Sequence, residues 1–238
     1  MIEAISFDLW NTLFENKFYS DIRLKNFTEF LKERKISYSL EDVRSAFNLG
    51  LKLSNINLEN INYRHIYTEE RISEVLQILD IRLTNSDKRL ITDEFERTML
   101  TEPPSLKTGV KQTLEELSSN YKIGLISNTG ITPGSIIKKV FKEYNILNFF
   151  QILVFSDEIG FYKPCPILFK TAIKKFSCKP SNVIHIGDIL ETDVKGAKQC
   201  DMKAIWINDS SSPKSEEIKP DYEIKRISEA IEIIKKLN

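Results

Sequence analysis

The sequence has few cysteines, no excess of charge of either sign and no long apolar run. Its three cysteines, Cys165, Cys178 and Cys200, are odd in number and form no C-x-x-C pair. This argues against a disulfide framework or a structural zinc site and favours free thiols in a reducing compartment. Thirty-four basic residues balance thirty-four acidic ones, so no net field attracts nucleic acid or an anionic membrane. An anionic ligand therefore needs a local binding site.

No apolar run approaches the ~20 residues that span a bilayer. The first residues also lack the basic segment and apolar stretch of a signal peptide. We therefore expect a cytoplasmic protein with neither a membrane nor a nucleic acid as partner. Its 238 residues suffice for one large domain, or for a core domain with a smaller one.

The first strand carries the first chemical signal. The segment 5–13 begins as an apolar run and stops at the carboxylate of Asp8. A buried parallel strand would place Asp8 at its C-terminal end, where open α/β sheets bind their ligands. Asp8 is thus a candidate nucleophile, although this stretch alone favours an aspartate that caps a turn.

The segment 15–102 has helical rather than strand periodicity. Its apolar residues predict four amphipathic helices without an intervening strand, a small bundle inserted after the first strand. The asparagine-rich segment 54–62 is expected to be the longest loop, and Pro103-Pro104 should end the bundle. The four predicted faces consist of Leu24, Phe27, Phe30 and Leu31; Val43, Phe47 and Leu51; Ile72, Val75, Leu76 and Leu79; and Ile91, Phe95 and Met99.

From residue 105 onward, predicted strands and helices alternate. This alternation predicts a doubly wound parallel α/β sheet with helices on both faces. The core would comprise residues 1–14 and 103–238, and the helical cap residues 15–102. The expected strands are 122–127, 151–155, 183–187, 204–208 and 222–224, and the expected helices are 107–119, 133–143, 164–176, 190–199 and 226–237.

Polar residues follow further strands of this predicted sheet. Ser127 and Asn128 end one strand, Lys163 precedes a helix with Pro164 at its first position, and Asp188 and Asp193 follow another strand. Each has an ordinary alternative as turn residue, surface lysine or helix cap. Together they supply nucleophile, cation and metal-ligand chemistry at one sheet edge.

The set resembles the haloacid dehalogenase superfamily of hydrolases. Asp8 with Thr12, Ser127, Lys163, and Asp188 with Asp193 match its four motifs in order and spacing. The segment 187–197 and the ending at 220–224 are similar too. The resemblance implies a helical cap inserted between motifs one and two, which closes over the active site.

The resemblance also implies a mechanism. Asp8 would attack phosphorus to form an aspartyl phosphate, which water then hydrolyses. Mg²⁺ would be held by Asp8, Asp188 and the carbonyl of Trp10, with Asp193 as a further ligand or as the group that fixes Lys163. Thr12 belongs to the catalytic set. Ser127, Asn128 and Lys163 would bind the phosphoryl group, with Trp10 beside them.

Trp10 departs from the family pattern. Most phosphatases of the superfamily have there an aspartate that protonates the leaving group and then activates water. An indole N–H cannot do this, and loss of a general acid–base typically removes about 10² to 10⁴ in rate. The sequence thus indicates a Mg²⁺-dependent phosphatase of a small phosphorylated metabolite with this group missing.

Two alternatives stay open. Hydrolytic 2-haloacid dehalogenases of the superfamily also lack that aspartate, but Asp188 would repel an anionic haloacid in the absence of a metal. A catalytically weakened binding or regulatory protein would keep the same fold. Either way the chain could be a monomer or a homodimer. Candidates to contact the substrate from the cap are Arg23, Arg44, Tyr63, Arg64 and His65.

Overall fold

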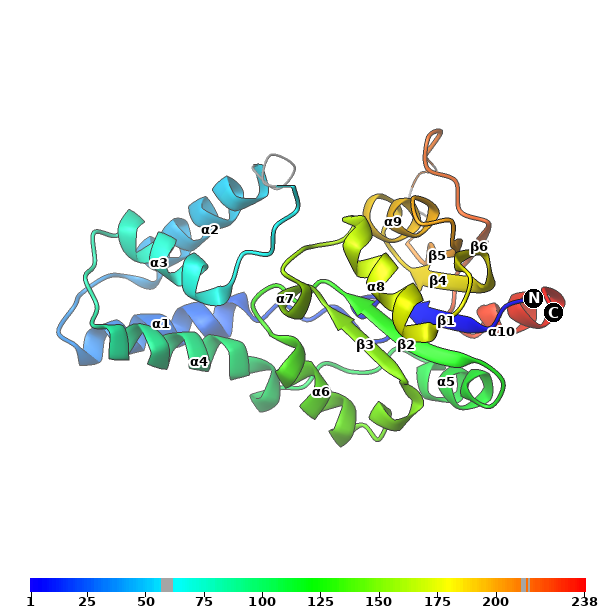
Figure 1. Ribbon diagram of the computed structural model, residues 1–238. Helices are drawn as coiled ribbons and strands as arrows, with labels where there is room; N and C mark the ends of the chain where they lie inside the picture. Colours follow the sequence, from blue (N-terminus) through cyan, green and yellow to red (C-terminus); the bar gives the residue numbers. More distant parts are fainter. Residues whose placement is uncertain (57–61, 211–212, 214) are drawn as a thin grey trace.

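Residues 1–56, 62–210, 213 and 215–238 are described in the computed structural model (Figure 1). Within them, no helix combines the length and the apolar character needed to cross a membrane. The expected loop 54–62 lies largely outside the described residues, and its first three residues belong to a helix that continues to Ile56.

A six-stranded, wholly parallel sheet forms the centre of the core, in the order β3-β2-β1-β4-β5-β6. Its inner strands are apolar and buried on both faces, as parallel sheets require. The predicted strand positions are confirmed to within one residue at each end. The strands are β1 (Ala4–Phe7), β2 (Lys122–Ser127), β3 (Ile152–Phe155), β4 (Val183–Gly187), β5 (Lys203–Ile207) and β6 (Tyr222–Ile224).

Helices cover both faces of the sheet (Figure 1). One face packs against α5 (Val110–Ser118), α6 (Gly134–Glu143) and α10 (Glu229–Lys236), and the other against α8 (Pro166–Phe176) and α9 (Lys195–Lys198). The short α7 (Ser156–Ile159) and two single turns, Leu147–Phe149 and Pro180–Asn182, complete the connections. The doubly wound α/β prediction is confirmed.

The helices expected at 107–119 and 226–237 begin three residues later, as α5 and α10, and two further predicted helices begin or wind differently. Helix α8 starts at Pro166, not at Pro164, because Cys165 is still extended (φ −53°, ψ 125°). The Lys163–Pro164 peptide is cis. The expected helix 190–199 is a π-helical turn, Leu190–Val194, followed by the short α9. Both departures lie beside the polar strand ends.

The inserted segment forms a bundle of α1 (Ser20–Glu33), α2 (Leu40–Ile56), α3 (Thr68–Ile78) and α4 (Asn85–Thr101), which extends beyond the sheet (Figure 1). The predicted apolar faces are confirmed, since nearly all their residues pack into one cluster centred on Phe27, Phe47 and Phe95. Only Met99 joins the core of the sheet instead. The exact division at residues 14/15 and 102/103 stays a prediction.

Hydrogen bonds join the bundle to two loops of the core. The backbone of Tyr63 accepts from Tyr162 N at 2.7 Å, and His65 N donates to Gly160 O at 2.8 Å. We call the segment 63–66 the strap. Further contacts reach the loop after β2: Thr68 Oγ1 donates to Ile131 O at 3.0 Å, and Arg23 Nη2 donates to Thr132 Oγ1 at 2.8 Å.

Candidate active site

Asp8 lies at the point where the order of the strands along the sheet reverses. From β1 the chain proceeds to β2 and β3 on one side, and then returns to β4, β5 and β6 on the other. Phe7 is in register with both Leu125 and Ile186, so Asp8 lies level with the ends of two neighbouring strands. A topological switch point of this kind leaves a crevice at the carboxyl ends of the strands, where open α/β sheets bind ligands.

Lys163 is the centre of the polar cluster. Its ammonium donates hydrogen bonds to Asp8 Oδ1 and, at 2.6 Å, to Asp193 Oδ1. All three side chains are buried, and Lys163 is only 3% exposed. The expectation that these motif residues meet is confirmed by their contacts, whereas the surface-lysine alternative is wrong.

Asp193 is held on both of its oxygens. Besides Lys163, Oδ1 lies 3.3 Å from Nε2 of the buried His185, and Oδ2 accepts from Ile189 N at 3.0 Å. The Nδ1 atom of His185 is 2.9 Å from the hydroxyl of Ser6. If Nε2 carries the proton, His185 donates to Asp193 and accepts from Ser6. Contacts between buried side chains therefore connect Ser6 on β1, through His185 on β4 and then Asp193, to Lys163.

Gly187 makes room for this carboxylate. A Cβ built on Gly187 would lie 2.4 Å from the Asp193 Cγ, far inside van der Waals contact. The π-helical turn brings Asp193 back over the end of β4, and only a residue without a side chain fits beneath it.

Asp188 is the third carboxylate. It is half-buried, and its Oδ2 accepts a 3.2 Å hydrogen bond from Asn11 Nδ2. Its backbone carbonyl accepts from the Trp206 indole at 2.8 Å. Ile189, rather than Asp188, precedes the following turn as its cap residue. The helix-cap alternative for Asp188 is therefore wrong.

The three carboxylates outnumber the single ammonium. Burial raises the pKa of Asp8 to about 7, in spite of the opposing charge of Lys163, and Asp193 and Asp188 add to the rise. Burial likewise raises the pKa of Asp188 to about 6, helped by the charge of Asp193. Burial opposes the ionisation of Asp193 too, but Lys163 and the bond from His185 hold its pKa below the usual range.

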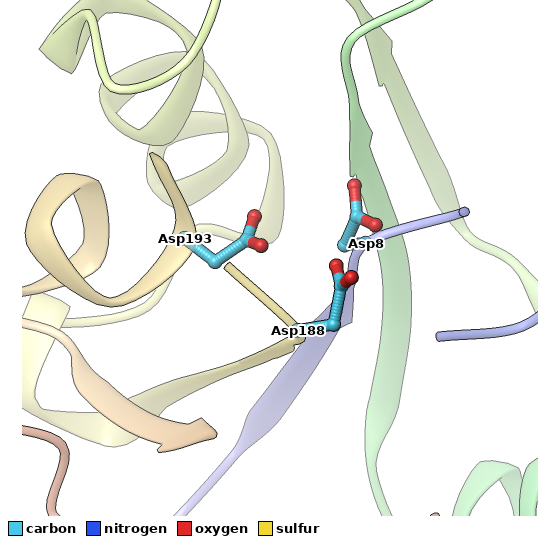
Figure 2. A group of neighbouring side chains, drawn as sticks. All are labelled: Asp8, Asp188 and Asp193. Atoms are coloured by element: carbon cyan, nitrogen blue, oxygen red, sulfur yellow. The ribbon is translucent and has the colours of Figure 1, made fainter. Parts of the chain in front are cut away.

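This arrangement fits a divalent metal ion. Figure 2 shows Asp188 and Asp193 directed toward Asp8, and one oxygen of each carboxylate lies within 4.8 Å of the others. A set of carboxylate oxygens suits Mg²⁺, and its charge would offset the excess negative charge. Asp8 keeps an oxygen that Lys163 does not engage, and Asp188 keeps one that Asn11 does not engage. Both oxygens of Asp193, by contrast, accept hydrogen bonds.

The other predicted residues surround this cluster. Ser127 is fully buried, and its hydroxyl donates a 3.3 Å hydrogen bond to Asn128 O. Asn128 Oδ1 accepts from Lys163 N at 2.8 Å, so this amide fixes the backbone of the lysine. The buried hydroxyl of Thr12 has no hydrogen-bond partner among the described residues.

A cavity of about 520 Å³ opens beside Lys163, between core and bundle. Trp10, Asn128 and Lys163 line it from the core, and Tyr63 and Arg71 from the bundle. Its volume lies in the range of small-molecule sites, roughly 300–1,000 Å³. Trp10 therefore does face the place where a substrate would lie.

Of the five cap candidates, Tyr63 alone lines this cavity. Arg23 is buried and donates to Phe95 O as well as Thr132, and His65 is buried against the Ser156 hydroxyl, 3.1 Å away. Arg44 and Arg64 pair at the surface, with Asp21 and Glu70 respectively.

Sequence reasoning missed Arg71 and His185. A single arginine on an amphipathic helix carries no signal, because solvated helix faces are rich in such residues. His185 did offer one: a lone histidine within an otherwise apolar strand needs a buried partner.

The fold and the site define an α/β hydrolase whose carboxylate cluster lies at the switch point of the sheet. A family model described as haloacid dehalogenase-like hydrolase matches residues 2–201, and the chain belongs to this family. The expected family membership is therefore confirmed.

Relatives along the full chain are named phosphatases. The chain is 27% identical to the glyceraldehyde 3-phosphate phosphatase of Pyrococcus furiosus, over 100% of this chain and 95% of the relative. It is 24% identical to the protein of the same name from Methanocaldococcus jannaschii, over 100% and 99%. The fold is similar to that of a 2-haloacid dehalogenase from Pseudomonas syringae, with a TM-score of 0.76, 21% identity and complete coverage of both chains.

Gly187→Ala should destabilise the protein by about 1–3 kcal/mol, because its Cβ would displace Asp193 from a packed site. Gly50→Ala is the matched control. Its Cβ would meet only the flexible end of Glu74, at 3.4 Å, and alanine favours the helix by up to about 1 kcal/mol. Urea unfolding measures both, and equal effects would contradict the close-packing argument.

The metal-free protein should lose stability as the pH rises from about 4 to 7. The folded-state pKa values of Asp8 and Asp188 lie above the ~4 of unfolded carboxyls, so the folded state binds more protons in this window. This stabilisation is complete below pH ~4, and it is lost as the pH rises through the folded-state pKa values of about 6 for Asp188 and about 7 for Asp8.

Urea unfolding in EDTA measures this slope, and saturating Mg²⁺ should flatten it. Asp8→Asn removes the main titrating group and should flatten it without metal. The same slope in Asp8→Asn as in the wild type would show that other groups cause it.

Proposed function

We propose that the protein is a Mg²⁺-dependent phosphatase that hydrolyses a small phosphorylated metabolite through an aspartyl-phosphate intermediate. The observation that carries this proposal is the shared ammonium of Lys163, which binds both Asp8 and Asp193 and borders a small-molecule cavity. The phosphatase names of the full-length relatives support it.

Asp8 acts as the nucleophile. Its carboxylate attacks phosphorus and the bond to the leaving oxygen breaks, which produces an acyl phosphate and an alcohol after proton uptake. Water then attacks the same phosphorus, so that inorganic phosphate leaves and the Asp8 carboxylate is regenerated. Lys163 and Ser127 hold the phosphoryl oxygens, and Asn128 keeps the Lys163 backbone in place. Thr12 belongs to the proposed catalytic set, and its buried hydroxyl has no hydrogen-bond partner among the described residues.

Asp8, Asp188 and the carbonyl of Trp10 would hold the metal, which offsets the repulsion between carboxylate and phosphate. The two hydrogen-bonded oxygens of Asp193 favour a positioning role. Asp193 keeps the ammonium of Lys163 beside the nucleophile and is itself oriented by His185.

Trp10 occupies the position from which the leaving group would be protonated. Its ring lines the cavity but supplies neither an acid nor a base near neutral pH. Esters with good leaving groups do not need this proton, whereas alkyl phosphates do. The enzyme therefore favours esters with good leaving groups, in addition to selecting substrates by their shape.

Dehalogenation of 2-haloacids is the weaker candidate. The aromatic Trp10 suits it, but half-buried Asp188 adds a negative charge opposite an anionic haloacid. A binding protein without catalysis would have to keep the whole Lys163 cluster for no chemical purpose.

Release of p-nitrophenol from p-nitrophenyl phosphate tests the nucleophile and the metal without needing an acid. The wild type should release it with Mg²⁺ and not with EDTA, and Asp8→Asn should reduce the rate at least ~10³-fold. Asp93→Asn, on the exposed face of α4, is the control and should retain the wild-type rate.

If the wild type releases no product with either Mg²⁺ or EDTA, the phosphatase proposal fails. Halide release from 2-haloacids is then measured. If that too is absent, a binding role remains.

Restoring a carboxylate at position 10 should accelerate alkyl phosphates. Trp10→Asp should raise the rate with glycerol 3-phosphate about 10- to 100-fold relative to p-nitrophenyl phosphate, because acid catalysis is worth up to about 10⁴ with poor leaving groups. Trp10→Asn has a similar size but no acid, and should leave the ratio unchanged. Equal ratios for the two variants would show that the gain comes from cavity size.

A further inference from the structure

Arg71 is a cation in the cavity that the phosphatase chemistry does not use. It lies on α3 of the bundle and lines the same cavity as Lys163 and Trp10. Its Nη2 donates to the Tyr162 hydroxyl at 3.0 Å, and its Nε donates to Ile66 O at 3.3 Å. These two bonds fix the plane of the guanidinium at the wall of the cavity.

The Tyr162 hydroxyl that receives Arg71 is itself held by the strap. It lies 3.3 Å from both N and O of Ile66. Tyr162 directly precedes Lys163, and its N–H donates to Tyr63 O at 2.7 Å. The guanidinium is therefore positioned relative to the catalytic lysine by a short, rigid series of contacts.

Apart from Lys163, the ionised side chains that line the cavity carry an excess of positive charge. Among the described residues, Arg71 makes no ion pair, and neither does Lys195, which lines the cavity from α9. Lys163, by contrast, is paired with Asp8 and Asp193. Glu191 is the one acidic side chain among the residues that line this cavity. Apart from the paired Lys163, the charges of Arg71, Lys195 and Glu191 therefore sum to about one positive charge.

Arg71 lines the cavity, and an arginine in such a place is suited to a planar carboxylate, which a guanidinium can bind through two parallel hydrogen bonds. The single excess charge matches a monoanion better than a second phosphate. The transferred phosphoryl group is held elsewhere, by Lys163 and the metal-binding cluster. A cavity of about 520 Å³ also has room for a short carbon chain between the two ends.

We propose that Arg71 determines substrate specificity by binding a carboxylate, so that the preferred substrates are phosphate monoesters of small hydroxy acids. The inference rests on the proposed phosphatase function. It distinguishes such substrates from aldehyde or alcohol phosphates of the same length, which offer Arg71 no negative charge.

Two three-carbon esters make the comparison. 3-Phosphoglycerate and glyceraldehyde 3-phosphate share a skeleton and differ at one carbon, a carboxylate or an aldehyde. The wild type should have the higher kcat/KM for 3-phosphoglycerate by at least ~10-fold, since only this substrate offers Arg71 a charged hydrogen-bond partner. Equal or reversed preference would overturn the proposal without any variant.

Arg71→Gln should raise KM for 3-phosphoglycerate about 10- to 100-fold. For glyceraldehyde 3-phosphate and p-nitrophenyl phosphate it should change kcat/KM less than ~3-fold. Arg71→Lys keeps the charge but loses the paired geometry, and should recover part of the loss. Arg34→Gln is the matched control, because Arg34 also donates to a carbonyl of the bundle, Phe30 O at 3.0 Å, but does not line the cavity. It should leave all three substrates unchanged.

The outcomes separate the two proposals. If the wild type hydrolyses none of the esters, the phosphatase proposal fails, and calorimetric binding of 3-phosphoglycerate to Asp8→Asn still tests Arg71. Binding that Arg71→Gln does not weaken would overturn the carboxylate site. An equal loss of kcat/KM for all substrates in Arg71→Gln would also overturn it, because the residue would then be structural.

Discussion

The excess of buried negative charge at the end of β1 is the constraint on which the site depends. Asp8, Asp188 and Asp193 come together at one sheet edge, and among the described residues Lys163 is the only lysine or arginine that forms an ion pair with them. Apolar packing supplies the energy to bring them there, because the strands that carry Asp8 and Asp188 are buried on both faces. Burial is the main cause that raises the pKa of Asp8 to about 7, and the charges of Asp193 and Asp188 add to this rise against the opposing charge of Lys163.

The π-helical turn after β4 divides the carboxylates into two kinds. It directs Asp193 back over Gly187, where both oxygens are occupied by Lys163, His185 and a backbone N–H. Asp8 and Asp188 each keep an oxygen that neither Lys163 nor Asn11 engages. The same element thus orients the lysine and leaves a pair of carboxylates for an ion, and a regular helix would place Asp193 elsewhere.

The strands, the bundle and the meeting of the polar strand ends could be predicted from the sequence, because each has a local cause. Apolar runs identify the buried strands, and helical spacing identifies the faces of the bundle. A parallel sheet then brings the ends of neighbouring strands together, so the proximity of Asp8 and Asp188 follows from topology. The start of α8 at Pro166 and the winding of 190–194 depend on packing that single-residue preferences do not encode. Arg71 could not be found at all, because its significance comes from a cavity made by segments far apart in the chain.

The strap has a consequence for protein engineering. Tyr63 and His65 are hydrogen-bonded to the segment that leads directly into Lys163, and His65 also contacts Ser156, which accepts from Thr129 N at 2.9 Å beside Asn128. The bundle is therefore not a module that can be exchanged without affecting the catalytic residues of the core. A chimera that receives the bundle of a relative would need that relative's counterparts of residues 129 and 156–162 as well. Without these counterparts, the grafted bundle would shift Lys163 from its position even in the absence of a substrate.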